Sequence, residues 1–399
     1  MTDEIAPPTE AQTGPGAYER LAKHLSTLGM GYPPRPELLE FLRALMTSAE
    51  AEVALLLPTA VTPLEVISVA EAVGRAGAAE ALSPPFDGAE IARVLEDLAT
   101  RGLLFAGTTP EGERGYGLLQ VGFGFPQTLF WDGGHKPESA AMAELVIKYF
   151  NREATREAYG ATTTKPYRYV PVNASLEEGL QAVLPAHAMK PILEQAQTFA
   201  LAHCPCRVAL RLRGRACEHP EDVCMKFDVL AEYLIERGLG RQIDRAEAFD
   251  VVRRSEEAGL VHFVDNAEGQ VKHNCNCCGC ACWNVGSIRR RKIPRDILMA
   301  TYFMRTTDLD ECTGCGGCAE VCPVAALTLE PRTDGARAGG RRSDTIAVVD
   351  PDWCIGCGVC VRRCPAGAAG LRPRADVSLN LAPDFLTLHR RILDEKGLS

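Results

Sequence analysis

Cysteine is missing from the first half of the chain, since none of the 17 cysteines in the 399 residues precedes Cys204. No apolar run approaches the roughly 18 residues that a membrane span needs, and aromatic residues make up only 6% of the chain. The segment Met1–Gly16 lacks the basic and apolar regions of a secretory signal peptide. These absences argue against a secreted or membrane-spanning protein, and we expect a cytoplasmic one.

Positive charge is also scarce. The chain has 43 Lys and Arg against 52 Asp and Glu, for a formal net charge of −9. Proteins that cover nucleic-acid phosphates or anionic membranes carry an excess of basic residues. With 46% hydrophobic and 24% charged residues, the composition is typical of a globular protein of two or three domains. We therefore expect no nucleic acid among its partners and no membrane span.

The cysteines that are present fall into two blocks, nine from Cys204 to Cys282 and eight from Cys312 to Cys364. An odd number confined to half of the chain is poorly explained by a disulfide framework, which also does not persist in a reducing cytoplasm. The pattern favours metal binding. Together with the patterns below, it predicts an α+β multidomain protein.

The cysteine-free region predicts a mainly helical domain over residues 31–160, after a flexible leader over residues 1–30. Apolar residues recur at helical spacing and strand-like runs follow them. The pattern predicts helices around residues 38–45, 63–73, 88–101 and 138–160, and strands at 103–105 and 116–121. Three helices followed by a hairpin resemble a winged helix-turn-helix, with residues 88–101 in the position of the recognition helix.

Charge argues against DNA as the ligand of this winged-helix-like domain. Residues 37–121 carry five Arg, no Lys and 13 Asp or Glu. Such a surface repels phosphate. We interpret the domain as a docking or structural module.

Residues 161–300 predict a mixed α/β, cysteine-rich middle domain. Strands are expected at residues 167–172 and 260–264. Ser175 and Glu178 form a capping box that opens a helix through Leu184. Further helices are expected from Pro191 onward and over residues 226–237 and 244–258, and a C-terminal helix is expected within residues 376–399.

The C-terminal cysteines form an internal repeat. Two runs follow the spacing C-x2-C-x2-C-x3-C-P, and they contain Cys312, Cys315, Cys318 and Cys322, then Cys354, Cys357, Cys360 and Cys364. About residues 305–372 thereby resemble the bacterial-type ferredoxin with two [4Fe-4S] clusters. The resemblance implies a ferredoxin-like dicluster domain over residues 301–375. It also implies that the fourth cysteine of each run binds the other run's cluster. Two zinc sites are the alternative.

The nine upstream cysteines do not form the two separate C-x2-C pairs that are usual in structural zinc sites; they are Cys204, Cys206, Cys217, Cys224, Cys275, Cys277, Cys278, Cys280 and Cys282. In an extended chain Cys275 and Cys277 would face away from Cys278, Cys280 and Cys282, although Gly279 can bend the run. We expect these nine to hold one or two additional iron-sulfur clusters, with zinc and redox-active thiols as alternatives. His203, His219 and His273 lie near cysteines, but we expect them to be ordinary core or surface histidines.

These observations predict an iron-sulfur electron-transfer protein, a carrier or a redox-enzyme subunit more than a stand-alone oxidoreductase. Low-potential electrons would pass between the C-terminal clusters and the upstream centres, with a donor or acceptor reductase as the redox partner protein. The chain has no P-loop and no dinucleotide fingerprint. One alternative is a reductase with a catalytic cluster on the upstream cysteines. Another is an iron-sulfur-sensing transcription regulator, which the acidic N-terminal domain disfavours.

Overall fold

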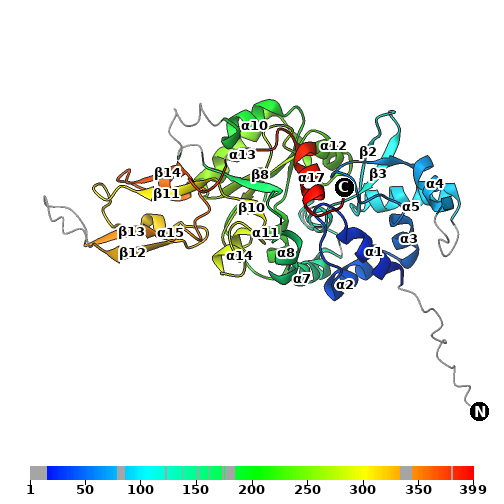
Figure 1. Cartoon of the computed structure of the whole chain (residues 1–399), viewed down its shortest axis with the longest axis horizontal. Helices are drawn as coiled ribbons and strands as arrows, with labels where there is room; N and C mark the ends of the chain where they lie inside the picture. Colours follow the sequence, from blue (N-terminus) through cyan, green and yellow to red (C-terminus); the bar gives the residue numbers. More distant parts are fainter. Residues whose placement is uncertain are drawn as a thin grey trace, which may run out of the picture.

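The structure is a computed structural model of the whole chain. It describes residues 16–78, 86–121, 124–136, 138–150, 152–160, 162–172, 175, 185–332, 344–378 and 381–399. Its mixture of helices and four separate sheets agrees with the expected mixed α and β content. Figure 1 shows an elongated arrangement, in which a seven-stranded sheet lies between a helical N-terminal part and two C-terminal strand pairs.

Helices dominate the N-terminal part. They are α1 (Ala17–Ser26), α2 (Pro36–Leu45), α3 (Ser48–Ala54), α4 (Val69–Ala78) and α5 (Gly88–Thr100). A small antiparallel sheet accompanies them in the order β1-β3-β2, from β1 (Ile67–Ser68), β2 (Leu104–Thr108) and β3 (Arg114–Leu118). Helix α5 begins at a capping box, because Asp87 accepts from the Glu90 backbone N–H and Glu90 accepts in return from that of Asp87.

The structure differs from the sequence predictions in this part. Residues 17–26, expected within a flexible leader, form helix α1, which buries Leu21 and Leu25 in the core. The helix expected from Pro63 begins only at Val69, because β-branched Ile67 pairs with Tyr116 as strand β1. The single helix expected over residues 138–160 is two helices, α7 (Ser139–Tyr149) and α8 (Arg152–Tyr159).

The central sheet has the strand order β10-β4-β8-β9-β6-β5-β7. Its strands are β4 (Tyr167–Val170), β5 (Phe199–Ala202), β6 (Cys224–Phe227), β7 (Arg241–Ile243), β8 (Val261–Asp265), β9 (His273–Cys277) and β10 (Met299–Ala300). Neighbouring strands are antiparallel except for β10 and β4. The order places β9 and β6 side by side, so their cysteines lie close together.

Helices also accompany the central sheet in the described part of the chain. They are α6 (Phe125–Thr128), α10 (Met189–Gln195), α11 (Pro205–Leu212), α12 (Val229–Glu236), α13 (Arg245–Glu257) and α14 (Val285–Arg289). The helix expected over residues 226–237 begins only at Val229, because residues 224–227 extend as β6 against β5 and β9. The helix expected from Ser175 to Leu184 falls on residues 176–184, which lie outside the described residues.

Two strand pairs and two helical turns form the C-terminal part. Strand β11 (Phe303–Thr307) pairs with β14 (Ala369–Pro373), and β12 (Leu327–Pro331) pairs with β13 (Thr345–Val349). Turns α15 (Gly317–Glu320) and α16 (Val359–Arg362) lie within the two cysteine runs.

The last helix, α17 (Phe385–Glu395), returns to the N-terminal half of the chain (Figure 1). The Glu395 carboxylate accepts hydrogen bonds from the backbone N–H groups of Thr163 and Thr164. Its partners thus lie about 230 positions earlier in the chain. Among the helices of the described residues, none has both the length and the apolar character of a membrane span.

Candidate metal centres

The eight C-terminal cysteines line two small neighbouring cavities. One is lined by Cys354, Cys357, Cys360 and Cys322, and the other by Cys312, Cys315, Cys318 and Cys364. Each cavity therefore combines three cysteines of one run with the fourth cysteine of the other. This is the grouping that the ferredoxin resemblance implied.

The spacing of these thiols fits a cluster better than a single ion. All eight cysteines belong to the described residues, yet no three of their Sγ atoms lie within 4.8 Å of one another. A [4Fe-4S] cluster binds each thiolate to a different iron, so it needs such a wide arrangement. Two left-handed glycines, Gly316 and Gly358, open the turns that follow. The donor set and its spacing thus fit two four-iron clusters.

Burial shapes the chemistry of these thiols. It raises the pKa of the Cys360 thiol to about 12 and that of Cys357 well above its ordinary value. Metal binding releases the proton of a cysteine ligand, because the thiolate is the species that coordinates. Backbone groups assist, since the N–H of Ala326 donates to Cys322 Sγ over 3.3 Å. Such hydrogen bonds tune the potential of a bound cluster.

Arg305 lies between the two cavities. Its side chain lines both of them, and it is 97% buried on strand β11, with 3% of the residue exposed. Its Nη2 atom lies 3.8 Å from Cys318 Sγ. Sequence analysis did not single out this residue, because it stands seven positions before the first cysteine of the motif and outside its spacing.

Upstream, six of the nine cysteines line one larger cavity. They come from three separate stretches of chain and are Cys204, Cys206, Cys224, Cys275, Cys277 and Cys282. Their thiols interact in an open series, from Cys224 to Cys275, Cys277, Cys282, Cys206 and finally Cys204, and the Cys282 and Cys277 Sγ atoms are 3.3 Å apart. These six cysteines, named the six-cysteine ring because they line one cavity, come both from residues 204–224 and from residues 275–282, which meet because strands β6 and β9 are neighbours.

The local fold explains the membership of this ring. Cys275 and Cys277 alternate along strand β9 and share one face, as expected for an extended chain. Cys282 was expected on the opposite face with Cys278 and Cys280, and that expectation is wrong. Strand β9 ends at Cys277 and the chain turns, which brings Cys282 Sγ to 3.3 Å from Cys277 Sγ.

Two buried cations accompany the six-cysteine ring. Burial alone would lower the pKa of Lys226, but the neighbouring charges of Cys224 and Cys275 raise it above its ordinary value. Arg207 is 99% buried, with 1% exposed, and its pKa is likewise raised by nearby thiolates against the effect of burial. The positive charges would compensate several thiolates in a dry site. Lys226 was not predicted from the sequence, because no sequence pattern marks it.

Aromatic and polar side chains complete the lining of the larger cavity. Trp131, Tyr167 and Phe263 contribute rings. His273 and Asp265 also line it, and His273 Nδ1 lies 3.0 Å from the Asp265 carboxylate. This contact accounts for the position of the His273 side chain, so no role as a metal ligand is needed to explain it. The site combines a thiol ring with an apolar chamber that holds a few polar groups.

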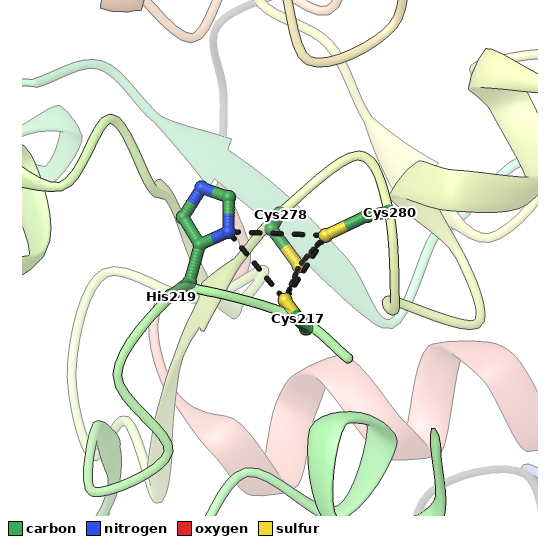
Figure 2. Close-up of side chains that lie close together, drawn as sticks. All are labelled: Cys217, His219, Cys278 and Cys280. Carbon is green, nitrogen blue, oxygen red and sulfur yellow. Dashed lines mark hydrogen bonds between the residues drawn. The ribbon is translucent and has the colours of Figure 1, made fainter. Parts of the chain in front are cut away.

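The remaining three upstream cysteines form a separate compact group with a histidine. Figure 2 shows Cys217, His219, Cys278 and Cys280 pointing toward one another. The Sγ atoms of Cys217 and Cys280 are 3.1 Å apart, and His219 Nδ1 lies 3.5 Å from Cys217 Sγ. His219 was expected to be an ordinary core or surface histidine, but the structure places it among these three cysteines. His203, for which the same was expected, forms a hydrogen bond with the Trp131 carbonyl instead.

The upstream and C-terminal sites are directly connected. The Arg289 guanidinium, at the end of helix α14, donates to the Cys322 carbonyl over 2.9 Å. Helix α14 follows Cys282 closely, and the Gly286 N–H already bonds to the Cys282 carbonyl. Arg295 donates to the Cys354 carbonyl over 2.7 Å. Backbone next to the six-cysteine ring is therefore tied to backbone of a C-terminal cavity.

Comparison with known proteins identifies the C-terminal segment. Residues 311–368 match the family model of a 4Fe-4S dicluster domain. The cysteine spacing predicted this domain, and the prediction is confirmed. The comparison with curated proteins finds no match for the chain.

Proposed function

We propose that the chain is an iron-sulfur electron-transfer protein that relays low-potential electrons between two C-terminal [4Fe-4S] clusters and a buried iron-sulfur centre on the six-cysteine ring. The observation that carries the proposal is the connection from Cys282 through helix α14 to the Cys322 carbonyl. The family match supports the C-terminal clusters. The proposed ligands there are the eight cysteines in their crossed groups.

The path between the two sites is short. Helix α14 begins three positions after Cys282, and its five residues, Val285–Arg289, span about 7.5 Å at 1.5 Å per residue. The side chain of Arg289 covers the rest of the distance to Cys322. Electron tunnelling weakens steeply with distance, so a short, packed connection favours transfer between the centres.

Electrons would enter or leave at the far end of the C-terminal domain. Cys315 is exposed, whereas the other cysteines of its cavity are buried or half-buried. A redox partner protein docked over Cys315 would approach the cluster of Cys312, Cys315, Cys318 and Cys364. We propose a reductase, as donor or acceptor, in this position, and a cytoplasmic setting for both.

Contacts between the N-terminal domain and the central part of the chain support an architectural role for the N-terminal domain. Helix α5 lies in the position of a recognition helix. Its Glu96 carboxylate accepts a hydrogen bond from the Arg237 guanidinium over 2.6 Å. Arg237 also donates to Thr100 of the same helix. These contacts bind α5 to the end of α12 in the central part of the chain. We therefore propose that the winged-helix-like domain docks on the cysteine-rich domain and binds no nucleic acid.

A reductase is the second candidate, and the chamber beside the six-cysteine ring favours it. Four thiolates saturate one [4Fe-4S] cluster, so six leave room for a larger cluster or for free thiols. Apolar chambers with a few polar groups are typical of small-molecule sites. Here Lys226 and His273 could orient a bound molecule or supply protons, while the cluster would supply electrons.

Iron and sulfide analysis of anaerobically purified protein tests the relay, together with EPR of the reduced state. Wild-type protein should contain more than the roughly eight irons of two [4Fe-4S] clusters. Cys277→Ser should remove the additional iron and its EPR signal, and Cys315→Ser should instead perturb a C-terminal signal. If the wild-type protein contains only eight irons and Cys277→Ser loses none, the relay to the ring is refuted.

Turnover experiments separate the two candidates. A reductase should show an EPR change at the ring when small electron-accepting molecules are added to reduced protein, and Trp131→Ala should alter that response. A pure carrier should show none, while it still exchanges electrons with a protein partner.

A further inference from the structure

The compact group of Cys217, His219, Cys278 and Cys280 has a geometry unlike that of the other cysteine sites. We propose that these four side chains bind one mononuclear Zn²⁺ ion, in a site that is separate from every iron-sulfur centre of the chain. The proposal concerns residues outside the relay and does not depend on it.

The four ligand atoms lie near the corners of a tetrahedron around one ion, with two sulfur pairs somewhat closer than a bound ion would hold them. Zinc binds sulfur at about 2.3 Å and imidazole nitrogen at about 2.0–2.1 Å. In a tetrahedron these bond lengths place two sulfurs about 3.8 Å apart and a sulfur and a nitrogen about 3.5 Å apart. The three Sγ pairs measure 3.1, 3.2 and 3.8 Å, and His219 Nδ1 lies 3.5 and 3.8 Å from two of the sulfurs.

The eight C-terminal cysteines of the same chain provide an internal comparison. A four-iron cluster separates its thiolates because each one binds a different iron. The eight C-terminal cysteines, within a matched 4Fe-4S dicluster domain, show this wide arrangement. Among the described residues, the four ligand atoms of the Cys217 group are the set that lies mutually within 4.8 Å. They leave space for one ion and too little for a cubane.

The ligand types and their positions also fit a structural zinc site. Three cysteines and one histidine are a common set for structural zinc. The ligands form two pairs, Cys217-x-His219 from the loop after α11 and Cys278-x-Cys280 from the turn after β9. Cys217 of the first pair and Cys278 of the second pair are 61 positions apart in the sequence. An ion would therefore join two loops that have no covalent connection nearby.

The place of the site in the fold suggests what the ion does. Zinc has no redox chemistry in proteins, so it takes no electrons from neighbouring clusters. The turn that it would hold contains Gly279, which packs against the Pro323 carbonyl beside Cys322. A zinc ion would thus fix the joint between the six-cysteine ring and the C-terminal clusters without exchanging electrons itself.

Metal analysis of the full-length protein, purified without oxygen, provides the first test. We expect about one zinc per chain in the wild-type protein. Cys280→Ser should lower the zinc content and leave the iron content unchanged. The matched control is Cys282→Ser, two positions away, which should keep zinc whether or not the six-cysteine ring holds iron. His219→Cys should retain zinc, because four thiolates also bind it.

Cobalt provides a second readout that does not require a variant to fold. Protein produced with Co²⁺ in place of zinc should show thiolate-to-cobalt charge transfer and intense visible bands of a tetrahedral ion. Absence of zinc from the wild-type protein would overturn the proposal. So would zinc that Cys280→Ser leaves in place, or a loss of about one or about four irons in that variant, since a mononuclear iron or a cluster would then occupy the site.

Discussion

Gly279 packs against the carbonyl group of Pro323 so closely that a Cβ atom at position 279 would lie 2.1 Å from the Pro323 oxygen. The contact joins the turn after β9 to the residue that follows Cys322. Only glycine fits at this position, because the opposing atom belongs to the backbone and cannot move aside as a side chain would. Backbone contact therefore holds the turn after β9 close to the C-terminal cavity that Cys322 lines.

The substitution Gly279→Ala should separate these two parts of the molecule. Overpacking of this kind costs about 1–3 kcal/mol, and relief of the clash would lengthen the path between the centres. We expect slower reduction of the six-cysteine centre in freeze-quench EPR, with the C-terminal signals retained. The control is Gly74→Ala in helix α4, where a Cβ meets nothing within 4 Å. An unchanged rate in Gly279→Ala would show that electrons do not cross this contact.

Removal of the Arg305 charge should make the C-terminal clusters harder to reduce. The guanidinium lies 3.8 Å from Cys318 Sγ and lines both cavities, so it stabilises the more negative, reduced state. Arg305→Gln should lower their reduction potentials by on the order of 100 mV, as expected for one buried charge at this range. EPR-monitored redox titration measures the shift. Arg93→Gln, which removes an exposed charge on α5, should leave the potentials unchanged.

Crossed ligation makes a prediction for pairs of substitutions. Cys322 lines the cavity of Cys354, whereas Cys312 lines the other one. The double variant Cys322→Ser and Cys354→Ser should therefore lose about four irons, one cluster. The double variant Cys322→Ser and Cys312→Ser should lose about eight, since both clusters lose a ligand. The reverse order of losses would show that each run binds its own cluster.

His389 on helix α17 should make stability depend on pH. Burial lowers the pKa of this histidine from 6.5 to about 4. Between pH 6.5 and pH 4 the imidazole is protonated in the unfolded chain but not in the folded chain. The free energy of unfolding is therefore highest above pH 6.5 and falls as the pH decreases toward 4. The loss from pH 7 to pH 5 is about 2 kcal/mol.

Urea unfolding under anaerobic conditions at both pH values checks this prediction. His389→Phe should remove this part of the pH dependence, whereas substitution of the exposed His135 by Gln should keep it. If His389→Phe leaves the difference between pH 7 and pH 5 unchanged, the buried histidine is not its source.

The C-terminal part of the account was predictable from sequence because its information is local. The spacing of Cys312, Cys315 and Cys318 places three thiols on one tight loop whatever surrounds it, and the family match confirms the domain. Helices with strong apolar periodicity and caps were also predictable, as at Asp244, whose side chain accepts from the Glu247 N–H at the start of α13.

The upstream sites were less predictable because sheet pairing decides them. Cys224 and Cys275 are 51 positions apart in the sequence and become neighbours only because β6 pairs with β9. The division between the six-cysteine ring and the group around His219 likewise depends on the turn after Cys277. No spacing rule contains these long-range contacts, which also bring Lys226 to the thiols.

The order in which the centres are reduced tests the central claim most directly. Wild-type protein and Cys315→Ser should be mixed with a low-potential donor protein and frozen at successive times for EPR. In the wild-type protein we predict that the C-terminal clusters are reduced first and the six-cysteine centre afterwards, and in Cys315→Ser that reduction of the six-cysteine centre slows markedly. Reduction of that centre at the same rate in both proteins would contradict the relay.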